Sequence, residues 1–502
     1  PNNIVVFQSG RYDFQSTVSL YNAINLTVMG QGQDVTFLIG HSPTMMFNAG
    51  NSVGLTLMMF SIDYQPLSFT AGYVVSVAAS YLDLQVVAPH QADVGRQVAA
   101  IYRFDLVRMR PSIGSAAYEI YQTPPSNANT TLRSNGTLRI PLASAYQFVV
   151  GDAIVARYSF GMHALYAQDL SDLTLQSITI YGAWYMGVFT LRVTRVTVRD
   201  YHVKRYNGRW LSTTADCMHF ADSRQYINIF DTSCEGQGDD GLNVQAFYFQ
   251  VIRILNSTSL IVQEYNWADI LNVGTGTRLD FSSSQQPFSV YATATLASNS
   301  VYNSSSQILQ FTSVINASVG DWLCVADTPT VTIQNFTVTN NRARGALLET
   351  RNVQLTFSLF NGTSGPAVLL QPSLYCQNSQ RAIQCTNAEG VQISRNYFNT
   401  ASSIAPVLLC NTKNISASNN NFISNQSALS QFYTYDNSTP CLTSLTSLIN
   451  LLPSAFNETF LPPIIATGSA RQVRPVKHPL QQVQCQQAYL TPKGHCLQDH
   501  QV

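Results

Sequence analysis

The chain has little charge and few lysines. Asp, Glu, Lys and Arg make up 11% of its 502 residues, and Lys+Arg and Asp+Glu each total 27, so the formal net charge is zero. Typical soluble domains are about 25% charged. Without a net charge, the chain has no field that would attract nucleic acid or an anionic membrane surface. We therefore expect no nucleic-acid partner.

Long apolar runs and clustered metal ligands are also missing. No run of about 18 apolar residues occurs, so no membrane span is predicted. The sequence begins at Pro1 without a signal peptide, and we interpret it as a mature or trimmed form. No Cys-x-x-Cys pair or histidine cluster indicates a metal site, and we expect no cofactor.

Glycosylation sequons are abundant where charge is scarce. In a chain rich in Ser, Thr and Asn, any single Asn-X-Ser/Thr sequon can arise by chance. The whole set, together with the low charge and only four lysines, favours a secreted, N-glycosylated protein. The twelve candidate sites are Asn25, Asn129, Asn135, Asn256, Asn303, Asn316, Asn335, Asn361, Asn414, Asn425, Asn437 and Asn457.

Nine cysteines fit the same oxidising compartment. The odd number leaves one thiol over, and Cys324 in an apolar run is the candidate. A buried free thiol is a simpler reading than an intermolecular bridge, although that thiol or the C-terminal tail would allow a homo-oligomer or a fibre. The pairs close enough in sequence to be joined are Cys376/Cys385, Cys485/Cys496, Cys217/Cys234 and Cys410/Cys441.

Alternating β stretches, each followed by an Asn- and Gly-rich turn, recur along the chain. Equivalent positions lie 23 residues apart at Leu175 and Val198, and 22 apart at Ile333 and Leu355. A period in the low twenties with two-residue alternation predicts one solenoid coil per repeat, and no leucine ladder of a helical repeat is present. We predict an all-β, right-handed parallel β-helix. The copies are residues 173–180, 196–203, 331–338, 353–360, 391–398 and 415–422.

Two long segments break this period. Each opens with a hairpin-like stretch and closes with Val-Gly-Asp and an apolar strand, and each is too long for a structureless loop. We predict that they are small β-barrels inserted into the helix. The predicted domains are residues 1–66 (N-terminal coils), 67–157 (first barrel), 158–246 (central coils with the active site), 247–326 (second barrel), 327–450 (C-terminal coils) and 451–502 (a Pro/Gln-rich tail).

Three aspartates are candidate catalytic residues. Asp216 lies 23 residues before Asp239, which is one coil length, and Asp240 follows directly. On neighbouring coils about 4.8 Å apart, these carboxylates would share one accessible patch. Their mutual repulsion would raise the pKa of at least one, giving a proton donor and a proton acceptor as glycosidic cleavage requires. The alternative is that Gly-Asp-Asp-Gly is only a solvated turn.

The chain resembles glycoside hydrolase family 110, the α-1,3-galactosidases, over most of its length. The matching stretches are residues 10–14, the turn at 30–32, His41, residues 60–64, Arg209-Trp-Leu-Ser-Thr-Thr-Ala-Asp-Cys-Met-His-Phe and Glu235-Gly-Gln-Gly-Asp-Asp-Gly-Leu-Asn-Val. The resemblance implies a β-helix with inserted barrels that removes terminal α-1,3-linked galactose with inversion and without a metal.

The resemblance also implies roles for individual residues. Asp216, Asp239 and Asp240 fall on the family's acidic motif, which implies catalytic roles for all three. By analogy with the related polygalacturonases, we expect Asp239 to be the general acid and the other two to hold and deprotonate the water. Substrate-binding candidates around them are His219, Arg209, Asn243, Gln245 and Trp210. At position 245 the family commonly has histidine, and an amide cannot take up a proton as imidazole can.

Two other functions compete with an extracellular exo-α-galactosidase. A non-catalytic structural or carbohydrate-binding β-helix would fit the Gln245 change, the dense sequons, the odd cysteine and the non-repeating tail. A lyase or epimerase fits the acidic trio less well, because such enzymes typically place a Lys, Arg or Tyr base beside an acidic sugar. For the galactosidase and for the carbohydrate-binding β-helix, the expected partner is a carbohydrate.

Overall fold

The computed structural model describes residues 3–41, 44–112, 120–121, 128–142, 148–158, 161–265, 273–284, 286–370, 383–386, 389–399, 407–410, 413–418, 420–423 and 433–434. Every regular element within them is a β-strand. The cysteine pairs predicted beyond residue 370 and the C-terminal tail lie outside the residues whose side chains are described. No helix in the described part is long and apolar enough to cross a membrane.

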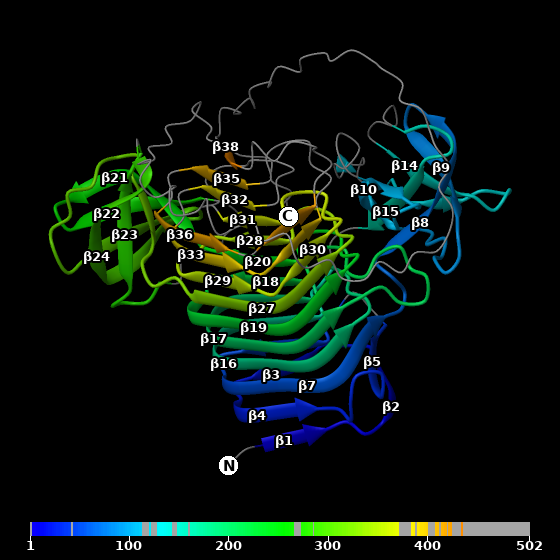
Figure 1. Ribbon diagram of the computed structural model, residues 1–502, viewed down its shortest axis with the longest axis horizontal. Helices are drawn as coiled ribbons and strands as arrows, with labels where there is room; N and C mark the ends of the chain where they lie inside the picture. Colours follow the sequence, from blue (N-terminus) through cyan, green and yellow to red (C-terminus); the bar gives the residue numbers. More distant parts are fainter. Residues whose placement is uncertain are drawn as a thin grey trace.

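Stacked parallel strands form the body of the molecule (Figure 1). In the central coils β16 (Leu165–Ile180) pairs with β17 (Val188–Val203), with Leu175 opposite Val198. Further along, β27 (Thr330–Thr339) places Ile333 opposite Leu355 of β29 (Val353–Thr356). The sequence period is therefore the coil period, and the predicted right-handed parallel β-helix is confirmed.

Alternation along each strand builds the core. In β18 (Met218–Ala221), Met218 and Phe220 point into the helix, and in β20 (Leu242–Gln245), Leu242 and Val244 do so directly above them. Side chains at the intervening positions point outward, because successive residues of a strand face opposite sides. The apolar interior is thus continuous along the stack, while one outer face remains for polar side chains.

The N-terminal coils begin the stack and the C-terminal coils extend it. In the first coils β1 pairs with β4, and β4 with β7. These strands are β1 (Asn3–Val6), β2 (Gly10–Phe14), β3 (Val18–Tyr21), β4 (Ile24–Met29), β5 (Thr36–Gly40), β6 (Phe47–Gly50) and β7 (Val53–Tyr64). The later ones are β19 (Arg224–Glu235), β28 (Ala346–Leu348), β30 (Leu359–Asn361), β31 (Val368–Leu370), β32 (Ile383–Thr386), β33 (Glu389–Ser394), β34 (Tyr397–Asn399), β35 (Val407–Cys410), β36 (Lys413–Ser418), β37 (Asn421–Ile423) and β38 (Tyr433–Thr434).

The first insertion lies to the right of the helix in Figure 1. Its described strands form an antiparallel sheet in the order β11-β10-β15-β8-β9-β14-β13, and β12 pairs with β10. Trp210 and Leu211 of the helix pack into its apolar cluster, beside Tyr102 and Phe104. The strands are β8 (Phe69–Ala78), β9 (Tyr81–Val86), β10 (Val98–Asp105), β11 (Arg110–Pro111), β12 (Ile120–Tyr121), β13 (Thr131–Leu132), β14 (Leu138–Pro141) and β15 (Ala153–Tyr158).

The second insertion, on the left in Figure 1, is a closed barrel. Its core continues into the helix, where Met186, Ala215 and Ala221 belong to the same apolar cluster as the barrel interior. The barrel strands are β21 (Tyr248–Asn256), β22 (Ser259–Tyr265), β23 (Arg278–Ser283), β24 (Gln286–Asn303), β25 (Ser306–Phe311) and β26 (Trp322–Val325).

Neither insertion separates the coils on its two sides. β7, before the first insertion, pairs directly with β16 after it. β20, before the second, pairs directly with β28 after it. Residues about a hundred positions apart in the chain are therefore neighbours on adjacent coils. This arrangement decides which side chains surround the aspartates.

Cysteines and sequons take definite places in the described residues. Cys217 and Cys234 form a disulfide in the helix core, with Cα atoms 6.0 Å apart, and Cys324 is a free thiol. Asn361 is half-buried, and the side chains of Asn414, Asn425, Asn437 and Asn457 lie outside the described set. The exposed sequon asparagines are Asn25, Asn129, Asn135, Asn256, Asn303, Asn316 and Asn335.

Candidate active site

One column of residues precedes the short strands of successive coils. Met218, Leu242 and Ala346 are in register, so the residues two positions earlier, Asp216, Asp240 and Arg344, are stacked on three neighbouring coils. Backbone hydrogen bonds maintain this stacking before the strands begin. The Cys217 amide donates to Asp240 O across 2.9 Å, and the Gly241 amide donates to Arg344 O across 3.0 Å.

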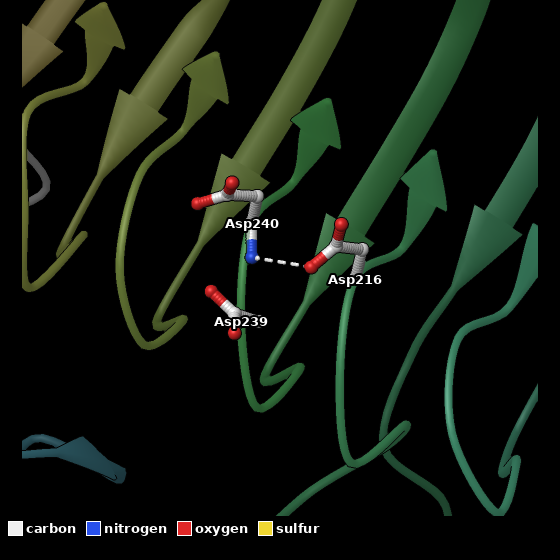
Figure 2. A group of neighbouring side chains, drawn as sticks. All are labelled: Asp216, Asp239 and Asp240. Atoms are coloured by element: carbon white, nitrogen blue, oxygen red, sulfur yellow. Dashed lines mark hydrogen bonds between the residues drawn. The ribbon is translucent and has the colours of Figure 1, made fainter. Parts of the chain in front are cut away.

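The three candidate carboxylates come together at this column, with Asp239 one residue before Asp240. One oxygen from each of Asp216, Asp239 and Asp240 lies within 4.8 Å of the others. Figure 2 shows the Asp216 carboxylate turned towards the backbone of Asp240, whose amide donates to its Oδ1 across 3.2 Å. The expectation that Asp239 is the coil equivalent of Asp216 is wrong. Strand register makes Asp240 the equivalent residue, because the repeat here is 24 residues rather than 23.

Two arginines that the sequence analysis missed complete the group. Arg342 Nη1 lies 3.0 Å from Asp239 Oδ2. Arg344 approaches Asp240 Oδ1 with both its backbone amide, at 2.9 Å, and its Nε, at 2.8 Å. The 104 positions between Asp240 and Arg344 conceal this proximity in the sequence. The signal was the Arg-Gly before an apolar strand at 344–345, which repeats the Asp-Gly at 240–241.

Burial is deeper than the sequence led us to expect. The side chain of Asp239 is 11% exposed, that of Asp216 5% and that of Asp240 1%. The expectation of a fully accessible patch is therefore wrong for Asp240, which is enclosed in an ion pair. Asp239 is the most accessible of the three.

Burial also separates the protonation of the aspartates. Burial raises the pKa of Asp239 well above its ordinary value, and the negative charges of Asp240 and Asp216 raise it further. The Arg342 cation lowers this pKa but does not cancel the rise. Burial likewise raises the pKa of Asp240, while Arg344 opposes the rise through its charge and its hydrogen bonds. Like charges held this close cannot all ionise freely. Burial and the neighbouring carboxylates thus favour a protonated carboxyl at Asp239.

His219, Gln245 and Asn243 lie on the same outward face. His219 Nδ1 is 2.8 Å from Asp216 Oδ2, and its Nε2 is 2.9 Å from Gln245 Oε1. Asn243 Nδ2 lies 3.4 Å from Asp240 Oδ2. Of these three predicted binding residues, His219 contacts Asp216 and Asn243 contacts Asp240, while Gln245 contacts His219. Gln245 occupies the far side of the His219 ring, where it fixes the ring orientation.

Arg209 and Trp210 have different surroundings. The two terminal nitrogens of Arg209 contact Asp63 at 2.6 and 2.8 Å in a buried ion pair. The indole of Trp210 is 5% exposed and stacks on Phe104 of the first insertion, with ring centroids 5.0 Å apart. Arg209 is thus paired within the helix and Trp210 packs between helix and insertion, which does not support the prediction that they bind substrate.

The spacing of the aspartate trio would also suit a cation. Carboxylate oxygens are ligands for hard divalent ions such as Ca²⁺ and Mg²⁺. In the present arrangement, however, the guanidinium groups of Arg342 and Arg344 lie against two of the three carboxylates. The positive charge facing the trio is therefore supplied by the chain itself.

Curated proteins similar in sequence are α-1,3-galactosidases. α-1,3-Galactosidase A of Shewanella woodyi is 26% identical over 327 residues, covering 57% of this chain and 52% of that protein. α-1,3-Galactosidase B of Parabacteroides distasonis is 27% identical over 219 residues, covering 40% and 35%. With that of Bacteroides fragilis, 22% identity extends over 455 residues, 79% and 73%. The chain thus spans about half or less of the length of the first two relatives. No family model matches it.

Solved structures similar in fold include enzymes acting on several polysaccharides. An endo-xylogalacturonan hydrolase from Aspergillus tubingensis shares 12% identity, with a TM-score of 0.34 and coverage of 88% of this chain and 90% of that one. The mannuronan C-5 epimerase A-module of Azotobacter vinelandii shares 11%, with a TM-score of 0.28 and coverage of 87% and 91%. At these scores the likenesses carry no functional argument.

Proposed function

We propose that this protein is an extracellular glycoside hydrolase that removes terminal α-linked galactose, with α-1,3-linked galactose as the preferred substrate. The observation that carries the proposal is the trio of Asp216, Asp239 and Asp240 within 4.8 Å on adjacent coils. The names of the curated relatives support the substrate class. The exposed sequons support an extracellular location.

In the proposed reaction, Asp239 is the general acid. Its carboxyl proton passes to the glycosidic oxygen as the bond from that oxygen to C1 of the sugar breaks. A water molecule adds its oxygen to C1, and its proton passes to the carboxylate of Asp216 or Asp240. Arg344 and Asn243 hold Asp240, and His219 holds Asp216, so both acceptors are fixed before substrate binds.

Stereochemistry is the part of the proposal on which two observations differ. Resemblance to the α-1,3-galactosidases implies inversion. The carboxylate oxygens within 4.8 Å are closer than the roughly 6.5–9.5 Å usual for inverting enzymes and nearer to the ~5–5.5 Å of retaining ones. We propose inversion, and ¹H NMR of the anomer released first from an aryl α-galactoside tests it directly. β-Galactose supports inversion, and α-galactose overturns it.

The activity itself is tested with aryl α-galactosides and an α-1,3-galactosyl oligosaccharide. We expect galactose release by the purified protein and none by an Asp239→Asn/Asp240→Asn double variant. If neither the wild-type protein nor the double variant releases galactose from any α-galactoside, the proposal is wrong.

A second candidate function is non-catalytic binding of glycans by an extracellular β-helix. The observation that favours it is the enclosure of Asp240, whose side chain is 1% exposed and paired with Arg344. On this reading the aspartates and arginines brace the coils. Galactoside binding without turnover, unchanged in Asp239→Asn, is the outcome that would establish it.

A further inference from the structure

Two arginines on a single turn each contact a different aspartate of the trio. The turn connects β27 to β28. Arg342 contacts Asp239 Oδ2 at 3.0 Å, while Arg344 contacts Asp240 Oδ1 at 2.8 Å. The side chain of Arg342 is 7% exposed and that of Arg344 is 19% exposed. Both guanidinium groups are largely enclosed, so their contacts with the two carboxylates are held by packing rather than made by mobile surface side chains.

Asn341 fixes this turn against the turn that carries the aspartates. Its side-chain Nδ2 donates to the backbone oxygens of Asp239 at 2.9 Å, Arg342 at 2.8 Å and Arg344 at 2.8 Å. The Arg342 amide also donates to Gln237 O across 3.1 Å. One fully buried amide group thus ties the backbone of both arginines to that of Asp239. This network fixes the backbone from which both arginine side chains project.

The two contacts are unequal. Asp240 receives two donors from Arg344 on one oxygen, at 2.9 and 2.8 Å, and is enclosed. Asp239 faces Arg342 through Oδ2 and keeps the larger exposed fraction of the two side chains. We propose that Arg342 and Arg344 are positioning residues that divide the acid–base work, Arg342 acting on the proton donor Asp239 and Arg344 on Asp240, one of the two carboxylates proposed to accept the proton of water. This inference rests on the proposed hydrolase function.

The chemistry gives each arginine a distinct effect. When Asp239 transfers its proton to the glycosidic oxygen it becomes a carboxylate, and the Arg342 cation stabilises that product. Arg344 opposes the rise that burial causes in the pKa of Asp240, and so favours the ionised form that accepts the proton of water. Other charged groups act on both aspartates: each faces the other and Asp216, Arg344 also faces Asp239, and His219 binds Asp216. The hydroxyl of Tyr102, from the first insertion, reaches the turn that carries Asp239 and Asp240. It lies 3.0 Å from the position that a Cβ on Gly238 would occupy.

The pH profile of kcat/KM separates the two effects. Its alkaline limb reports loss of the acid's proton, and its acidic limb reports protonation of the base. Removing a cation raises the pKa of the carboxyl that it faced. Arg342→Gln should therefore move the alkaline limb to higher pH, and Arg344→Gln should move the acidic limb to higher pH. A shift of about one pH unit or more is expected for a lost contact of this kind.

The experiment uses the full chain, an aryl α-galactoside and a control variant. Arg199→Gln removes an arginine whose side chain is 49% exposed and paired with Asp231 on the helix surface, and it should move neither limb. Arg342→Lys and Arg344→Lys keep a charge but lose the planar fork, so each should shift the same limb as its glutamine variant by a smaller amount. Circular dichroism confirms the fold of each variant, and the lysine pair decides the outcome if a glutamine variant does not fold.

Distinct results overturn the inference and the proposed function. An inactive wild-type protein contradicts the proposed function itself. An active wild type in which both arginine variants shift the same limb, or neither limb, leaves the hydrolase in place and rejects the division of work. A lowered kcat with an unchanged profile means that the arginines only brace the turn, which also rejects it.

Discussion

The backbone amide of Asp240 donates to the side chain of Asp216 across 3.2 Å, so two residues on adjacent coils are held by one hydrogen bond (Figure 2). Asp239, the residue before Asp240, is more exposed than either. Three carboxylates in one cluster therefore have three different environments. An acid–base mechanism requires such a difference between its proton donor and its proton acceptor.

Asp239→Asn should lower kcat by about 10²–10⁴-fold, because an amide cannot deliver a proton to the leaving oxygen. Substrates with activated leaving groups, such as dinitrophenyl galactoside, should lose far less. The measurement is kcat on a natural oligosaccharide beside the activated substrate. Asp231→Asn is the matched control, since Asp231 is exposed on the helix surface and should tolerate the change. Full activity of Asp239→Asn on the oligosaccharide would contradict the assignment.

Gln245→Leu should reduce kcat by about 10- to 100-fold with little change in KM, because it removes the partner 2.9 Å from His219 Nε2 and loosens the ring that orients Asp216. Gln245→His, which restores a polar ring at this position, should lose less. Steady-state kinetics of the two variants provide the comparison. If the leucine variant folds and keeps the wild-type kcat, Gln245 has no part in orienting His219.

The buried pair Arg209–Asp63 should matter for stability rather than catalysis. Replacing Arg209 with leucine leaves the Asp63 carboxylate buried without its partner, and we expect a loss of about 3–5 kcal/mol in the free energy of unfolding. A double replacement, Arg209→Met with Asp63→Leu, should recover much of it. Denaturant unfolding measures both, and kcat of the folded double variant should stay close to wild type. A large loss of kcat there would return Arg209 to the substrate-binding set.

Stability should fall on acidification through His90. Its Nε2 accepts the Trp210 amide across 3.2 Å, so it must be unprotonated, and burial lowers the pKa of this histidine to about 4. An unfolded chain takes up the proton near pH 6.5, so the free energy of unfolding should decrease from about pH 6.5 down to about pH 4. Thermal melts across this range measure the slope. His90→Gln should flatten the slope, and an unchanged slope would show that other groups are responsible.

Some of the architecture could be predicted because it is repeated. Leu175 and Val198 occupy equivalent places in their repeats, and the structure pairs them directly. Periodic alternation of apolar residues needs no tertiary information, since each coil buries the same face. Arg342 was missed for the opposite reason. It lies 103 positions from Asp239 in the chain, and only the direct stacking of β28 on β20 makes them partners.

Period and residue type are local properties, so the parallel β-helix, the stretches that interrupt it and the members of the aspartate cluster could all be predicted from the amino-acid sequence. Strand pairing in three dimensions was needed to show that Asp240 rather than Asp239 is the coil equivalent of Asp216, and that Arg344 encloses it. Strand register and burial fix these relationships. Both depend on the packing of β20 against β28, which the second insertion separates in the chain but not in space.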